Sequence, residues 1–309
     1  MRQDLLTKNG IAVRMLAREF LSLKPNDRID TIGEYAQKFD LGRGTIQTAL
    51  RYLEDNKAIE LDSRGHLGTF ILKLEYKKLW TSVGFSNISG VMPLPYSKRY
   101  EGLATGLYKV FATENIPFNL AYVRGGERRL EDLQNEKYDF AIMSRLAATA
   151  NIEAGKDVKI IIDFGANSYV SSHRIIFADN NKTQIEDGMK VALDPKSIDH
   201  LILTRHECQD KNVTFVELAY NQIISSILSR ELDAAVWNYD EIQDHGLVIK
   251  NEPLRSKEAQ DIEGSNTRAV LVVMQNNWGV EKIINRVLNK EKVIKIQTDV
   301  ILNRILPEY

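Results

Sequence analysis

Strand and helix patterns alternate twice in the same order between residues 81 and 237, and this alternation constrains the fold more than any other feature. A short phrase also repeats, since Glu136–Ile142 parallels Arg230–Val236, each between a helix and a loop. Two βαβαβ lobes in one α/β domain are therefore predicted. The first has strands at 81–85, 118–123 and 138–143 and helices at 98–112 and 127–134. The second has strands at 191–193, 213–216 and 233–237 and helices at 197–204 and 219–228. Further strands are expected at 159–163, 174–178 and 269–274.

The first 75 residues have a different pattern, with three short helices followed by two strands. An apolar stripe predicts a helix over 10–23. Thr31 followed by Glu34 is a capping box that begins a second helix. After a turn at 40–42, a third helix over 44–56 turns Ile46, Ala49, Leu50 and Leu53 inward. A glycine turn within 59–71 then predicts a wing.

The outer face of the third helix carries side chains suited to DNA. Two helices joined by a short turn, the second with a polar outer face, have the geometry that enters a major groove. Arginine suits phosphate or guanine, glutamine suits adenine, and the threonine methyl suits thymine. Any three-helix packing also has a polar outer face, so the pattern alone leaves both interpretations open. The predicted DNA-binding residues are Arg43, Thr45, Gln47, Thr48 and Arg51 on the helix, and Arg64, Gly65 and His66 on the wing.

The segment Arg28–Ile71 resembles the DNA-binding domain of GntR-type regulators, through the run Gly42–Glu54 and the wing Arg64–Phe70. Their signature is S-R-G-T-V-R-x-A-L-x-x-L-E followed by G-R-G-T-F, and the likeness spans about 45 residues. The resemblance implies that Arg43, Thr45, Gln47 and Gly65 lie at the DNA. Two positions depart from the signature, because Gly42 replaces the usual serine and Gln47 the usual second arginine. These departures leave the operator sequence unpredicted.

The two lobes resemble a type II periplasmic-binding-protein-like domain, which commonly serves as a sensor in transcription factors. Taken end to end, the chain is similar to the YhfZ family, in which a GntR-like winged helix-turn-helix precedes such a sensor. The segments Gly90–Ser97 and Tyr122–Gly126 carry this closer likeness. The resemblance implies a winged helix-turn-helix domain over 1–75 and a two-lobed effector-binding domain over 76–309. A doubly wound α/β enzyme remains an alternative, because fold alone does not fix function.

Polar residues follow several predicted strands, where open α/β sheets bind ligands against helix N-termini. Arginine there can fork onto a carboxylate or phosphate, and glycines allow a close backbone approach. Each residue could equally belong to a solvated loop. As a group they predict a small, anionic effector in a cleft between 81–165 and 172–265. The predicted ligand-binding residues are Ser97, Arg124, Ser144, Arg145, Ser197 and Asn238.

Composition narrows the function classes further. The net charge of −1 argues against a polybasic nucleic-acid or membrane binder, and the single Cys208 excludes an intrachain disulfide. No signal peptide, membrane span, nucleotide-binding loop, hydrolase elbow or metalloprotease motif is present. The histidines show no metal spacing, and His200 and His206 are expected at the surface. We therefore expect a cytoplasmic regulator without metal or cofactor. It should dimerise on double-stranded DNA, because a near-neutral domain binds phosphates weakly alone. An enzyme with a vestigial helix-turn-helix and an effector-free architectural DNA binder remain the alternatives.

Overall fold

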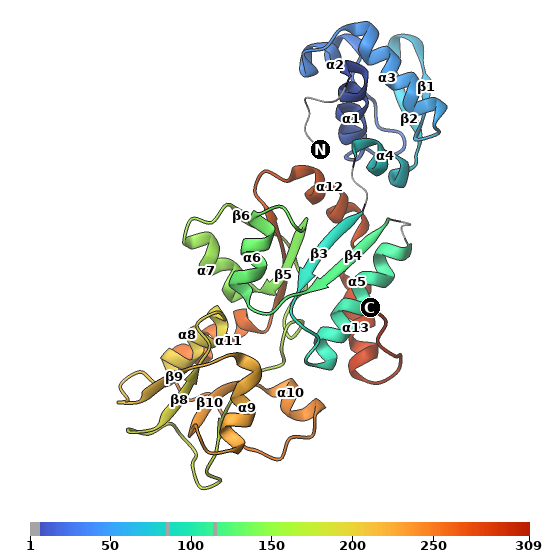
Figure 1. Cartoon of the computed structure of the whole chain (residues 1–309). Helices are drawn as coiled ribbons and strands as arrows, with labels where there is room; N and C mark the ends of the chain where they lie inside the picture. The colour runs from blue at the N-terminus through green and yellow to red at the C-terminus, as the bar shows by residue number, and fades with distance from the viewer. Residues whose placement is uncertain (1–6, 85–86, 114–115) are drawn as a thin grey trace. The chain divides into compact units, whose positions relative to one another are not determined.

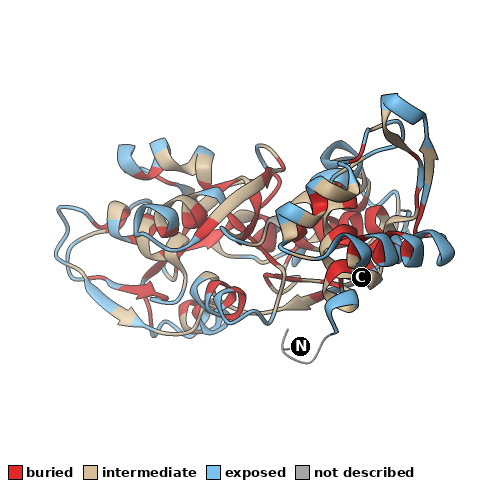
Figure 2. Cartoon of the chain, turned by 90° about the horizontal axis from the view of Figure 1, so that it is seen from above, coloured by how far each residue is buried: buried red, intermediate tan, exposed pale blue. Residues whose placement is uncertain are grey.

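The computed structural model describes residues 7–84, 87–113 and 116–309 (Figure 1). These residues form two compact units. The first unit contains residues 7–84, 87–88, 111–113, 116–118 and 278–287, and the second contains residues 89–110, 119–277 and 288–309. Figure 2 shows the buried residues concentrated on the strands and on the inward faces of the helices.

The first unit is built around three helices and a two-stranded wing. Helix α1 (Lys8–Phe20) packs on α3 (Arg43–Asp55), and α2 (Ile32–Phe39) begins at the predicted capping box. Strands β1 (Ile59–Ser63) and β2 (Thr69–Leu74) pair antiparallel, with the short 3-10 helix η2 (Gly65–Leu67) between them. The predicted helices and wing are confirmed.

The predicted strand at 81–85 is wrong, because residues 81–83 belong to helix α4 (Tyr76–Val83) and Phe85 lies outside the described residues. The β-branched Thr81 and Val83 favour a strand locally. Packing overrides that preference, since Leu79, Trp80 and Val83 share the buried face of α4. The Nε of Arg14 on α1 donates to the Val83 carbonyl at 2.6 Å. The first strand of this lobe is β3 (Ile88–Met92) instead.

Helix α12 (Trp278–Val287) belongs to the first unit although it lies near the C-terminal end of the sequence. Its Arg286 guanidinium donates to the Leu23 carbonyl at 3.3 Å and lies 3.7 Å from the centroid of the Tyr76 ring. Arg286 thereby ties α12 to the residues that follow α1 and to the start of α4.

The second unit contains two lobes whose five-stranded sheets have equivalent strand orders. In the first lobe the order is β4-β3-β5-β12-β6, and in the second it is β9-β8-β10-β7-β11. In each sheet one strand, β12 or β7, runs antiparallel to both its neighbours. These two strands follow the crossings of the chain between the lobes. Besides β3, the strands are β4 (Phe118–Tyr122), β5 (Phe140–Ser144), β6 (Val158–Asp163), β7 (His173–Phe177), β8 (Lys190–Leu193), β9 (Thr214–Glu217), β10 (Ala234–Asn238), β11 (Lys250–Pro253) and β12 (Ala269–Met274).

Helices cover both sheets and confirm the remaining predicted elements. In the first lobe α6 and α7 pack on β5 and β12, while α5 lies against α13 (Figure 1). A Cβ added at Gly102 or Gly106 of α5 would come within 2.9 Å of α13 backbone, so these glycines permit the close approach. In the second lobe α8 and α9 pack on β10, and α11 packs on α8. The helices are α5 (Lys98–Thr113), α6 (Gly126–Gln134), α7 (Arg145–Glu153), α8 (Ile198–Glu207), α9 (Tyr220–Leu228), α10 (Tyr239–Asp244), α11 (Lys257–Asn266) and α13 (Lys290–Ile301).

Candidate functional site

Helix α3 presents an exposed polar face that follows a tight turn after α2. Asp40 ends α2 in the left-handed conformation, and Gly42 is the N-cap of α3 without a side-chain cap. Arg43, Gln47, Thr48 and Arg51 are exposed, and Thr45 is half-buried. The Thr48 hydroxyl donates to the Gly44 carbonyl at 2.9 Å, which leaves its methyl group on the outer face.

The wing lies beside this helix face. Gly65 has φ of +56°, a conformation that favours glycine. The Nε of Arg64 donates to Asp62 at 2.7 Å and the guanidinium lies 4.5 Å from the Phe70 ring centroid, so Arg64 is held along the wing. His66 is exposed. A groove between helix and wing is lined by Arg43, Gln47, Arg51 and Gly65.

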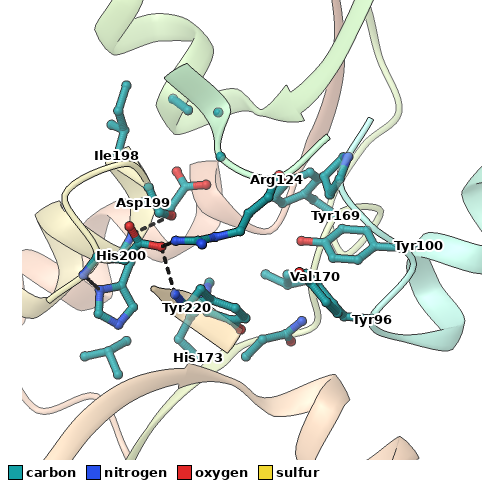
Figure 3. A pocket seen from close by; sticks show the side chains of 18 of the residues that line it. Tyr96, Tyr100, Arg124, Tyr169, Val170, His173, Ile198, Asp199, His200 and Tyr220 are labelled. Atoms are coloured by element: carbon teal, nitrogen blue, oxygen red, sulfur yellow. Dashed lines mark hydrogen bonds and ion pairs between the residues drawn. The ribbon is translucent and has the colours of Figure 1, made fainter. Parts of the chain in front are cut away.

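The second unit contains a cavity of about 100 Å³ between its two lobes. A single water needs ~10–15 Å³ of such space, so the cavity fits a small metabolite. Figure 3 shows the lining side chains converging from both lobes. The cavity is lined by loops and helix N-termini, including Tyr96 and Tyr100 before and on α5, Gly125 and Gly126 at α6, Tyr169, Val170 and His173 at a crossing, Ser197, Ile198 and Asp199 at α8, and Tyr220 and Glu241 at α9 and α10.

Arg124 enters this cavity as half of an ion pair. Its Nη2 lies 2.9 Å from the Asp194 carboxylate, which is 3% exposed and also accepts the Tyr220 backbone N–H at 3.1 Å (Figure 3). Asp194 therefore neutralises the arginine that the sequence assigned to an anionic ligand. Gly125, with φ of +84°, lets the chain turn into α6 against the Lys196 carbonyl.

Two further polar contacts hold the lobes together around the cavity. The Ser144 hydroxyl donates to Asp199 at 2.6 Å and accepts the Ala147 N–H, so it caps α7 and bridges the lobes. Arg99 of α5 forms two bonds to Asp240 of α10, at 3.0 and 3.2 Å. Because these pairs span the lobes, the structure represents a closed arrangement of the second unit.

The six predicted ligand residues occupy different environments. Arg124, Ser197 and Asn238 line the cavity. Ser97 and Ser144 are buried and cap helices beside it. Arg145 does not line the cavity, and its guanidinium pairs with Asp163 at 2.9 Å. Helix capping and ion pairing engage all six of these side chains, because Ser197 and Asn238 also cap α8 and α10 and Arg124 pairs with Asp194.

The cavity also contains residues that the sequence analysis did not select. His200 is 5% exposed, so the prediction that it lies at the surface is wrong. Its Nδ1 accepts the Asp194 N–H at 3.2 Å, because the strand-to-helix turn directs it inward. Arg129 is buried and donates to the carbonyls of Val123 and Ile142. The tyrosines and acidic residues that line the cavity have no distinctive spacing in the sequence. Only their positions after predicted strands could have marked them as candidates for the site.

Burial controls the ionisation of the cavity groups. Desolvation raises the pKa of Glu241 to about 8, against hydrogen bonds from Tyr220 and Asn238 that favour the carboxylate. Desolvation also raises the pKa of Asp199 to about 6 and lowers those of His173 and His200 to about 4. Near neutral pH the histidines are therefore uncharged, and Glu241 is mostly protonated.

Comparison with known proteins identifies the family. Residues 75–309 match the YhfZ C-terminal domain model, and residues 24–71 match a helix-turn-helix domain model. YhfZ of Escherichia coli (strain K12) is 31% identical over 315 residues, covering 100% of both chains. The chain belongs to the YhfZ family. The crystal structure of YhfZ from Shigella flexneri is 31% identical, with a TM-score of 0.62, and the match covers 75% of this chain and 97% of that chain.

The fold of the second unit extends beyond the YhfZ family. The VFT2 domain of Bordetella pertussis BvgS is 14% identical, with a TM-score of 0.51 over 72% of this chain and 96% of that domain. The predicted fold class, a helix-turn-helix followed by a two-lobed periplasmic-binding-protein-like domain, is confirmed. A helix-turn-helix domain joined to a YhfZ C-terminal domain points to a regulator rather than an enzyme. Among the described residues, no helix is long and apolar enough to span a membrane, and no group of three acidic, histidine or cysteine residues is arranged for a metal.

Proposed function

We propose that this YhfZ-family chain is a DNA-binding transcriptional regulator whose operator affinity is controlled by a small metabolite bound between the two lobes. The observation that carries the proposal is the cavity of the second unit, lined by residues of both lobes, in a chain whose first unit contains a helix-turn-helix. Ligand binding in such a cavity must favour the closed arrangement, because the lining comes from both lobes.

On the DNA side, we propose a GntR-like mode in which α3 enters the major groove. Arg43, Thr45, Gln47, Thr48 and Arg51 then contact the DNA from α3, with Gly65 at the wing backbone. Arg64 and His66 extend the contact to the neighbouring backbone. Exposure of the α3 side chains and the groove between α3 and the wing support this assignment.

On the ligand side, we propose that Arg124, Ser197 and Asn238 contact the effector directly, and that Ser97, Ser144 and Arg145 belong to its surroundings. Arg124 still offers an Nε without a hydrogen-bond partner among the described residues. An anionic group of the ligand would bind there beside the N-terminus of α6, despite the charge of Asp194.

We further propose that the regulator is a cytoplasmic homodimer. Operator DNA is cytoplasmic in bacteria, and one near-neutral DNA-binding unit gains little affinity from phosphates. Two copies on a symmetric site would have half-sites ~34–36 Å apart. Footprinting tests this directly, because protection of a single asymmetric half-site by a monomer contradicts it.

The test of the proposal measures how the operator DNA and the metabolite affect each other's binding. An operator is first selected with the full chain from random DNA, and its affinity is then measured with and without metabolite extracts. The expected coupling is about 5–150-fold in affinity, and the selected operator must change metabolite affinity by the same factor. Catalytic turnover of the bound metabolite would support the enzyme alternative instead. Metabolite binding that leaves operator affinity unchanged would contradict effector control.

A further inference from the structure

Three tyrosines and a buried carboxylate line the same cavity. Tyr220 donates its hydroxyl to Glu241 at 2.9 Å, and the ring centroids of Tyr96 and Tyr220 lie 6.1 Å apart. Tyr96, Tyr100, Tyr220 and Glu241 all line the cavity. Burial raises the pKa of the three tyrosines, and the charge of Glu241 adds to each shift, for Tyr100 after the contributions of Tyr169 and Tyr220. In Figure 3 the rings of Tyr96 and Tyr100 lie on one side of the cavity and Tyr220 lies below it.

Glu241 has no cationic partner among the residues that the structure describes. It is 6% exposed, and its hydrogen bonds come from Tyr220 and from the Asn238 amide at 3.5 Å. The nearby Asp240 and Asp244 carry the same sign of charge and oppose its ionisation. The arginine on this side, Arg99, is already engaged by Asp240. A buried acid without a counter-ion is costly when ionised, and a ligand cation would remove that cost.

Other charged groups of the cavity have hydrogen-bonding or charged partners within the protein. Arg124 pairs with Asp194, and Asp199 accepts the Ser144 hydroxyl with Arg129 close enough to favour its charge. Glu241 is the group left without an opposite charge in this part of the described chain. Aromatic faces around such a group attract cations, and ammonium groups are recognised by cages of this composition.

We infer that the cage formed by Tyr96, Tyr100, Tyr220 and Glu241 binds an ammonium group, so the effector is an amine or an amino-acid-like zwitterion. This inference rests on the proposed function and names the chemical class of its effector. The ammonium donates to the Glu241 carboxylate and lies against the tyrosine rings. A zwitterion would in addition place its carboxylate near Arg124, which unites the cage with the anionic preference expected from the sequence.

The cage predicts a proton exchange on binding. Near neutral pH Glu241 is mostly protonated, since its pKa is about 8, and an ammonium ligand favours the carboxylate. Binding at pH 7 should therefore release about one proton, and binding well above pH 8 should release almost none. The groups facing Glu241 are Tyr96 before α5, Tyr100 on α5, Tyr220 on α9, and Asp240 and Asp244 on α10.

The experiment uses the full chain and three matched sets of compounds: the twenty L-amino acids, the same carboxylic acids without the amine, and the corresponding amines without the carboxylate. Thermal shift selects binders, because a ligand that binds the folded state raises the melting temperature. Calorimetry at pH 7 in two buffers of different ionisation enthalpy then counts the released protons. Amine-bearing compounds should bind, and their carboxylic analogues should bind at least tenfold more weakly. If the amines without a carboxylate bind as tightly as the amino acids, the effector is a simple amine. If they bind more weakly, it is a zwitterion.

Variants make the assignment specific. Glu241→Gln keeps an acceptor for Tyr220 and should weaken the selected amine at least tenfold and abolish proton release. Tyr96→Leu should weaken it severalfold, and Tyr96→Phe should restore most of the affinity because the aromatic face is kept. Glu153→Gln, at an exposed position of α7, is the matched control and should change nothing.

Three outcomes would overturn the ammonium site. If carboxylic acids without an amine bind as tightly as the amino acids, or if Glu241→Gln leaves affinity unchanged, the cage does not bind the ligand, while effector control of DNA binding stands. If none of the three sets raises the melting temperature, the ammonium site also fails. The operator-coupling experiment with metabolite extracts then decides independently whether the proposed function fails with it.

Discussion

The exposed face of α3 and the cavity between the lobes use similar polar side chains under opposite conditions. Arg43, Gln47 and Arg51 are exposed and come from one contiguous helix. The Arg124–Asp194 pair comes from two loops and Glu241 from helix α10, and both carboxylates are at least nine-tenths buried. Exposed groups can be changed with little cost to stability, whereas buried ones support the fold and the ligand together. We therefore expect substitutions to separate binding from stability on α3 and to couple them in the cavity.

The largest effect expected concerns the pH dependence of stability through Glu241. Its folded pKa of about 8 lies above the unfolded value of ~4.3, so the stabilising neutral form is fully present below pH ~4.3 and is lost as pH rises through 8. Each pKa unit corresponds to ~1.4 kcal/mol, which makes the total on the order of 5 kcal/mol, with about 4 kcal/mol of it lost between pH 5 and pH 8.5. Glu241→Gln does not titrate, so its stability relative to the parent chain should rise between pH 5 and pH 8.5.

Urea unfolding of the parent chain and Glu241→Gln at both pH values measures this difference. Glu153→Gln is the control, because that glutamate is exposed and should follow the parent chain at each pH. A stability difference that stays constant from pH 5 to pH 8.5 would show that Glu241 is ionised throughout. The contrast between a strained buried acid and the exposed α3 face would then be lost.

The next effect concerns Asp194, whose removal should destabilise the second unit by about 3 kcal/mol. The carboxylate accepts bonds from Arg124, Lys196 and Tyr220, and Asp194→Ala leaves all three donors without it. Breaking a buried pair typically costs ~3–5 kcal/mol, and the partial exposure of Arg124 places the value at the low end. Asp194→Asn should lose less stability, because the amide keeps one oxygen that can accept a hydrogen bond. Denaturant midpoints check this, and equal stability of Asp194→Ala and the parent chain would contradict it.

On the exposed face, Arg43→Ala should weaken operator binding by roughly 1–3 kcal/mol and change stability by less than ~0.5 kcal/mol. Arg51→Ala should behave similarly. Lys77→Ala is the control, since Lys77 is exposed on α4 rather than on α3 or the wing. Gel-shift titration and thermal unfolding of the same samples test both statements. An unchanged operator affinity for both arginine variants would exclude α3 as the recognition helix.

The same contrast explains how much the sequence could predict. Periodicity and capping locate α2, α3 and the wing, because those features depend on neighbouring residues. The alternating pattern predicts the lobes, and it fails at residues 81–83 because packing of Trp80 overrides local strand preference. For the cavity, the pattern indicates which loops carry polar residues but not which side chains interact there. It could not show that Asp194 would pair with Arg124 or that Ser144 would bridge to Asp199, since those residues lie 70 and 55 positions apart.

The smallest effect concerns the beginning of α3, where local rules alone should decide the outcome. Gly42 is the N-cap and has no side-chain cap, and its φ of −65° suits any residue. An added Cβ would meet only the Thr45 hydroxyl, at an ordinary 3.7 Å. Gly42→Ser supplies a side-chain oxygen for the free N–H groups of the first turn and should stabilise α3 by a few tenths of a kcal/mol.

Gly42→Ala is the matched control for this prediction, because it adds the Cβ without the oxygen and should destabilise α3. Hydrogen exchange of the amides in 43–55 resolves such small changes within one helix of the full chain. The two variants should shift protection in opposite directions, and both should leave exchange in the second unit unaltered. If serine and alanine shift protection in the same direction, capping does not control the start of α3. The stability of the start of α3 would then depend on tertiary contacts, as the stability of the cavity residues does.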